Sequence, residues 1–157
     1  MRRLNRRYES DKFVELKNMK RLRIVIAVLY GLQVFLTSEP FVGDAENTVT
    51  AFKMFVLMFR ADSTSMFFTC LLFSVLLIFP AVCFFFYCLD RKSNVKSVLS
   101  IVCCFVCTYI IVFELNGVFL SGALFTLLVD ILILFLSVVL MLATASYNRE
   151  LKEKESK

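Results

Sequence analysis

The sequence predicts an all-α membrane protein: a bundle of four transmembrane helices, with a short amphipathic helix on the outer surface between the first and second spans. Composition is the first observation, because 59% of the 157 residues are hydrophobic and 20% are charged. A soluble domain of this size could not bury that much apolar surface in one core. The second observation is that the apolar residues fall into four long stretches.

The four expected spans are residues 22–37, 66–89, 98–115 and 122–146, all within one domain. The first would cover about 24 Å as a helix, slightly less than a typical hydrocarbon core of about 30 Å. Its flanking Lys20, Arg21 and Arg23 can extend its reach by snorkelling to the interface. Because no small-x-small cleavage site follows it, we expect an uncleaved signal anchor.

Residues 41–50 are expected to form a polar connector, and residues 48–60 a short helix interrupted by Lys53 and closed by Arg60. The apolar part of this segment is too short to span a membrane. With Asn47 or Thr48 as its N-cap, it is expected to lie on the outer lipid surface. The alternative is a hydrophobic lid over the bundle.

Basic residues are distributed unevenly about the expected spans. Sixteen of the 18 Lys and Arg residues fall in residues 1–23, in the loop after the second span, or after residue 145. The positive-inside rule therefore predicts that both tails, residues 1–21 and 147–157, are cytoplasmic, in a plasma or inner membrane. Residues 1–21 form either an amphipathic helix on the inner leaflet or a solvated tail.

This basic excess predicts contact with anionic lipids and gives little support for nucleic-acid binding. The residues expected to face the lipid headgroups are Arg2, Arg3, Arg6, Arg7, Lys20, Arg21 and Arg23.

The chain has no His, which argues against zinc chemistry and histidine-based catalysis, and we expect no metal or cofactor. Its six cysteines all fall in expected spans. Cys104 and Cys107 have the CxxC spacing of four-helix membrane oxidoreductases of the quinone-linked disulfide-forming and vitamin K epoxide reductase type. Those enzymes need the pair at an aqueous face and a second pair in a loop, so we expect these cysteines to pack as small apolar residues. No enzymatic activity is predicted.

Small and polar side chains gather on one face of each of the last two spans. On the fourth span Gly122, Thr126, Asp130, Ser137 and Thr144 fall within an arc of about 80° at helical spacing. On the third span Ser97, Ser100, Cys104, Cys107 and Glu114 fall within about 100°. Both faces are expected to point into the bundle, where small residues allow close approach and polar ones find partners.

Asp130 is the most informative of these residues, because a charge in the middle of a membrane helix costs about 2.5–3.5 kcal/mol on insertion scales. It must therefore have a partner, face a water-filled cavity, or be protonated. The expected intramembrane polar site contains Asp130, Glu114, Gln33, Thr126 and Thr69, with Lys53 or Arg60 as counter-ions. A purely structural pair of Asp130 with Lys53 or Gln33 is the alternative.

The sequence thus favours a non-enzymatic integral membrane protein that is an accessory, assembly or regulatory subunit of a larger membrane complex. The alternative is a small oligomeric transporter or channel, in which Asp130 couples to a cation or proton with Glu114 at the outer mouth. The first function implies a membrane-protein partner, and the second implies further copies of the same chain.

Overall fold

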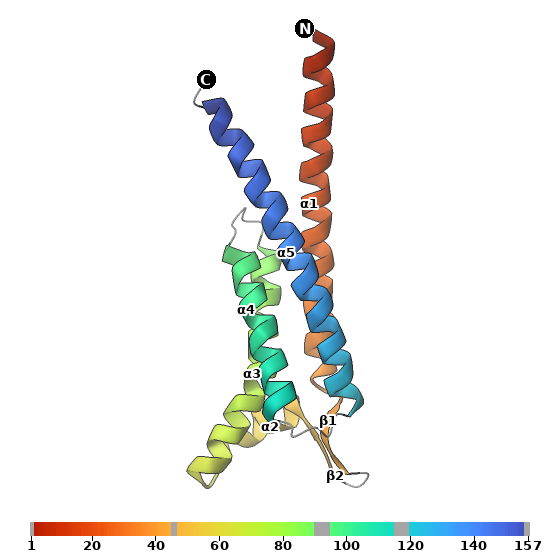
Figure 1. Cartoon of the computed structure of the whole chain (residues 1–157). Helices are drawn as coiled ribbons and strands as arrows, with labels where there is room; N and C mark the ends of the chain where they lie inside the picture. The colour runs from red at the N-terminus through yellow and green to blue at the C-terminus, as the bar shows by residue number, and fades with distance from the viewer. Residues whose placement is uncertain (1, 45–46, 90–94, 115–119, 156–157) are drawn as a thin grey trace.

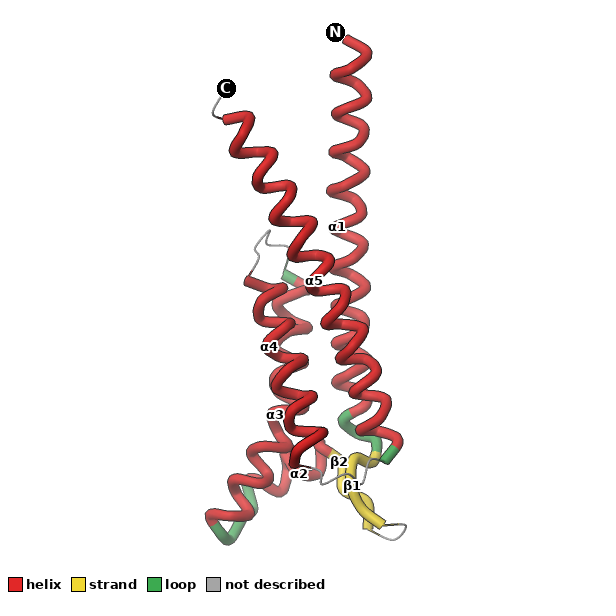
Figure 2. Tube along the Cα trace, in the orientation of Figure 1, coloured by secondary structure: helices red, strands yellow, loops and turns green. Residues whose placement is uncertain are grey.

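The computed structural model describes residues 2–44, 47–89, 95–114 and 120–155, and the chain is mostly helical (Figure 1). In chain order the elements are α1 (Arg2–Leu36), β1 (Pro40–Asp44), β2 (Asn47–Thr50), α2 (Ala51–Met58), α3 (Thr64–Cys88), α4 (Val95–Tyr109), the π-helical turn η1 (Ile110–Glu114) and α5 (Ser121–Glu155). Figure 2 shows the two strands, in yellow, at the end of the molecule opposite both termini.

Three helices in the described part of the chain are long and apolar enough to cross a membrane: Thr64–Cys88, Val95–Phe113 and Ser121–Arg149. They overlie the expected second, third and fourth spans, although Leu115, the expected end of the third, lies outside the described residues. Large side chains on the outside of the helices are exposed, among them Phe105 at 63% and Phe135 at 65%. Such surfaces are stable in lipid, so the chain is a multi-pass membrane protein.

The helices pack in a closed order. α1 contacts α3 and α5, and α4 contacts the same two helices from the other side. Each helix therefore turns one face toward a shared interior and leaves the opposite face outward. On α1 the inward face carries Ile26, Tyr30 and Gln33, and Thr37 continues this face directly after the helix; all four are buried and spaced by three or four residues.

The first and last helices are longer than the expected spans. Residues 2–21, expected as a separate surface helix or a solvated tail, continue the same helix as the apolar stretch that follows, and α5 continues to Glu155. Neither extension contains Gly or Pro. Extending an existing helix avoids the unfavourable nucleation step, so charged helix-forming residues can follow a membrane helix without a break.

The expected polar connector at residues 41–50 is a β-hairpin. β1 pairs with β2 in antiparallel register, with Val42 opposite Val49 and Asp44 opposite Asn47. The extended conformation suits the β-branched residues of β2. The helix expected over residues 48–60 is therefore shorter, and its N-cap is Thr50, whose hydroxyl accepts a hydrogen bond from the Lys53 amide at 3.0 Å.

The hairpin and α2 are fixed next to the ends of α1 and α5. The Phe52 amide of α2 donates to the Thr37 carbonyl, directly after α1, at 3.1 Å, and the Leu120 amide, directly before α5, donates to the Phe41 carbonyl of β1 at 3.4 Å. Phe41 is fully buried. At Gly122 the backbones approach so closely that an added Cβ would lie 2.6 Å from the Pro40 carbonyl oxygen. The start of α5 therefore depends on a residue without a side chain.

α2 packs against α3, and together they form a helical arm, residues 51–69. In Figure 1 this arm extends away from α1 and α5. Residues 64–69 of α3 are all exposed, and the first buried residue of this helix is Cys70. Phe52, Phe59 and Phe68 are exposed on the arm, which therefore carries an apolar surface outside the helix contacts.

The Gly122 contact predicts a large effect from one methyl group. Gly122→Ala should lower the free energy of unfolding by about 1–3 kcal/mol, because the carbonyl at Pro40 belongs to the backbone and must shift. Thermal unfolding of the detergent-solubilised protein, followed by circular dichroism, measures the loss.

Gly31→Ala is the matched control. Its added Cβ would lie 3.6 Å from the Phe84 ring, an ordinary contact, and alanine favours the helix. If both variants unfold at the wild-type temperature, α5 does not rest on β1 as described.

Candidate intramembrane polar site

The polar stripes of α4 and α5 face the interior. On α5 Thr126, Asp130, Ser137 and Thr144 are all buried, as are Ser97, Ser100, Cys104 and Cys107 on α4. Their spacings of three, four and seven residues keep each set on one side of its helix. The orientation predicted from these spacings is confirmed for all eight residues.

Asp130 meets Gln33 across the α1–α5 contact. The Gln33 Nε2 donates a hydrogen bond to the Asp130 Oδ1 at 2.8 Å. Gln33 is 0% exposed and Asp130 is 1% exposed, so water does not compete for this bond. An amide donor to a carboxyl group in a low-dielectric interior gives a strong and directional contact. The bond therefore fixes the rotation of α1 and α5 relative to each other.

A second polar layer joins three helices. The Tyr30 hydroxyl lies 2.6 Å from the Ser100 hydroxyl, which in turn lies 2.7 Å from the Ser137 hydroxyl. These residues come from α1, α4 and α5. Because Ser137 follows Asp130 by seven residues, this layer lies about 10 Å from the first along the helix axis. The first polar contact therefore joins α1 to α5 directly, and the second joins them through Ser100 of α4.

Three buried oxygens of the site have no hydrogen-bond partner among the described residues: Asp130 Oδ2, Gln33 Oε1 and Thr126 Oγ1. Thr126 precedes Asp130 by one helical turn on the same face. A carboxyl oxygen, an amide oxygen and a hydroxyl can together accept a proton, a water molecule or a hard cation. The site therefore has unused acceptor capacity beside the Gln33–Asp130 bond.

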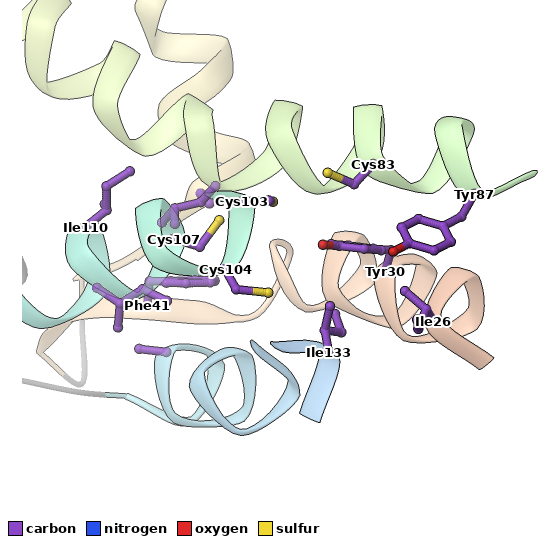
Figure 3. Close-up of a cluster of buried hydrophobic side chains, with 14 of the residues drawn as sticks. Ile26, Tyr30, Phe41, Cys83, Tyr87, Cys103, Cys104, Cys107, Ile110 and Ile133 are labelled. Carbon is purple, nitrogen blue, oxygen red and sulfur yellow. The ribbon is translucent and has the colours of Figure 1, made fainter. Parts of the chain in front are cut away.

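Cysteine thiols surround this polar site. Figure 3 shows Cys83, Cys103, Cys104 and Cys107 in the cluster with Tyr30 and Ile133. All six cysteines of the chain are free thiols, and five of them are buried. Cys104 belongs to the buried face of α4, so its thiol lies in the same interior as the buried Asp130 carboxyl group.

The other expected site residues lie elsewhere. Thr69 is exposed on the helical arm, where its hydroxyl donates to the Ser65 carbonyl at 3.1 Å. Lys53 and Arg60 are also exposed, whereas the hydrogen-bond partner of the buried Asp130 is Gln33. The side chain of Glu114 lies outside the described residues. Of the expected site, the structure thus brings together Gln33, Thr126 and Asp130.

The expected site omitted residues that line the polar interior, among them Tyr30, Ser100, Cys104 and Ser137. Each had a signal in the sequence. Tyr30 precedes Gln33 by three residues and so shares its face of the helix, and the other three belong to the polar stripes of their own helices.

The Gln33–Asp130 bond predicts different effects from two substitutions. Gln33→Leu should lower the free energy of unfolding by about 1–3 kcal/mol, because it removes the donor from a buried carboxyl group. Asp130→Asn should be close to wild type, since the asparagine oxygen can still accept from Gln33. Circular dichroism during thermal unfolding in detergent compares them.

Leu32→Ala, next to Gln33 on the exposed side of α1, is the control and should change little. The double variant Gln33→Leu/Asp130→Leu should recover stability, because apolar replacements remove both unsatisfied groups. A Gln33→Leu variant as stable as wild type would show that the bond contributes nothing.

Comparison of the chain with family models, with curated proteins and with solved structures found no match. The function of the site is therefore inferred from the chemistry of its own side chains.

Proposed function

We propose that the chain is a non-enzymatic, four-span protein of the plasma or inner membrane, serving as an accessory, assembly or regulatory subunit of a larger membrane complex. The observation that carries this proposal is the Gln33–Asp130 hydrogen bond. The bond supports a structural role for the intramembrane carboxyl group, as part of the contact between two helices. The function is then proposed to lie in contacts that the exposed surface makes with a partner.

Residues 22–37, which include the apolar half of α1, are proposed as a further span, the first in chain order, in addition to the three spanning helices of the fold. This segment packs against α3 and α5, which are both long enough to cross a membrane. Its outward side chains are exposed and apolar, including Ile24, Val28 and Phe35. Four spans also suit the position of both termini at one end of the molecule (Figure 1). Since basic residues concentrate at that end, we assign it to the cytoplasm.

The helical arm is the proposed contact with the larger partner. It lies at the end opposite the termini, and α2 is proposed as the outer interfacial helix. Phe52 and Phe59 of this segment are exposed, and Phe68 extends the apolar surface onto α3. Aromatic side chains are enriched in the buried centres of protein interfaces and also at membrane interfaces. An arm with this surface can seat on a neighbouring membrane protein at the level of the headgroups.

The accessory function predicts recovery of a stoichiometric partner when the chain is purified from its native membrane in a mild detergent. The triple variant Phe52→Ser/Phe59→Ser/Phe68→Ser should lose that partner while keeping the helical content measured by circular dichroism. The control triple variant, Phe105→Ser/Phe125→Ser/Phe135→Ser, changes exposed phenylalanines of α4 and α5 and should retain it. Repeated recovery of the wild-type chain alone would contradict the proposal.

The second candidate function is a small oligomeric transporter or channel that couples to a proton or cation at Asp130. The specific observation in its favour is the unused acceptor capacity of Asp130 Oδ2, Gln33 Oε1 and Thr126 Oγ1. Ionisable residues inside membrane spans commonly mark proton and ion pathways. Glu114, in η1 at the end of the α4 helix, is the proposed outer-mouth residue of this pathway.

Transport predicts a flux that depends on the acid. In proteoliposomes the wild type should carry a proton, Na⁺ or K⁺ current reported by ion-sensitive dyes, and Asp130→Asn should abolish it because the amide cannot exchange a proton. Ser137→Ala, in the other polar layer, is the control and should retain flux. No flux from the wild type would exclude transport while leaving the accessory function intact. Equal flux from wild type and Asp130→Asn would exclude coupling at Asp130.

A further inference from the structure

A groove of about 490 Å³ lies between the middle of α1 and the C-terminal end of α3, on the side of the bundle toward which both termini extend (Figure 1). Its volume falls within the range of about 300–1,000 Å³ that is typical of small-molecule sites. The α1 wall is formed by residues on one side of the helix, from Lys20 to Val28. The α3 wall is formed by Phe84, Tyr87 and Cys88, at the C-terminal end of that helix. This groove is separate from the Asp130 site, since Gln33 lies more than one helical turn beyond Val28.

The groove is cationic at one end and apolar at the other. Lys20 and Arg23 line the end nearer the N-terminus, and their spacing of three residues places them on one side of α1. Ile24, Val28 and Phe84 line the rest. From Lys20 to Val28 the helix rises about 12 Å, which is the scale over which a bilayer changes from headgroups to hydrocarbon.

Tyr87 also lines the groove, and it contributes its ring. It is 6% exposed and packs against Tyr30, with 5.9 Å between the ring centroids, and its hydroxyl is buried away from the groove. The lining therefore offers two cations and then an apolar wall, in the order in which a phospholipid presents its phosphate and its chains.

We propose that this groove is a binding site for an anionic phospholipid of the leaflet that faces both termini. Lys20 and Arg23 attract the headgroup, and the acyl chain lies along Ile24, Val28 and Phe84. The membrane that surrounds the three spanning helices supplies the ligand, and the two cations select a negative headgroup over a zwitterionic one. Assignment of that leaflet to the cytoplasmic side rests on the proposed topology, whereas the site itself does not.

The chain carries its own reporter for this site. Cys88 lines the groove and is exposed, whereas the other five cysteines are buried. The full-length protein in detergent is therefore treated with a maleimide, and intact-mass spectrometry follows the rate of the first alkylation. Short-chain phosphatidylglycerol, short-chain phosphatidylcholine and inorganic phosphate are the three added probes.

Phosphatidylglycerol should protect Cys88 at a concentration about 25-fold lower than phosphatidylcholine does. Each of the two nearby cations should raise the affinity for a negative headgroup about fivefold. Lys20→Gln/Arg23→Gln should abolish this preference. The control Lys17→Gln/Arg21→Gln removes two exposed charges of the same helix that do not line the groove, and should retain it. Inorganic phosphate should give no protection.

Equal protection by the two lipids would overturn the proposal, as would a preference that survives in Lys20→Gln/Arg23→Gln. Protection by inorganic phosphate would assign the site to a free anion instead. An acyl adduct already present on Cys88 in the intact mass would mean that a covalent chain occupies the groove, which also contradicts the proposal.

Discussion

The hydrogen bond between Gln33 and Asp130 is the contact on which the arrangement of the helices depends. In lipid, the apolar faces of two helices gain little from choosing each other over the hydrocarbon chains, so packing and polar contacts must select the partners. A buried carboxyl group makes that selection strict, because any rotation of α5 that turned Asp130 outward would place it in hydrocarbon. The Tyr30–Ser100–Ser137 layer adds a second constraint and includes α4. α3 completes the interior with apolar and thiol side chains such as Leu76 and Cys83.

The sequence predicted which face of α4 and of α5 points inward, but it did not predict which helices pack against each other. Periodicity placed Thr126, Asp130 and Ser137 on one face, since the spacing of polar residues along a helix depends on that helix alone. It could not show that Gln33 is the donor to Asp130, because the order in which helices pack depends on all their surfaces together. By its charge, Lys53 was an equally good candidate for the partner of Asp130. It lies instead on α2, the short helix that directly follows the β-hairpin, where its side chain is exposed.

The local differences from the sequence prediction have separate physical causes. The β-hairpin is short and contains Gly43, Asp44 and Asn47, which a sequence reading treats as loop residues. Its stability comes from contacts with distant segments, above all Phe41 and the glycine at the start of α5. The charged end of α1 was expected as a separate surface helix or a solvated tail, and that of α5 as a tail, but charge indicates exposure and leaves open whether the neighbouring helix continues. Thr69 was expected in the interior by its depth, whereas pairing of the first turns of α3 with α2 moves it to the surface.

The length of α1 has a mechanical consequence. Its 35 residues form one helix of about 52 Å, with no proline along its length. One end is tied to the β-hairpin and α2 through Thr37, and the other carries the arginine-rich segment. Bending a continuous helix disturbs many backbone hydrogen bonds at once, so the helix behaves as a stiff rod on the scale of the bilayer. A tilt imposed at the hairpin is therefore converted into a lateral displacement of the basic segment on the opposite side, without any change inside the helix.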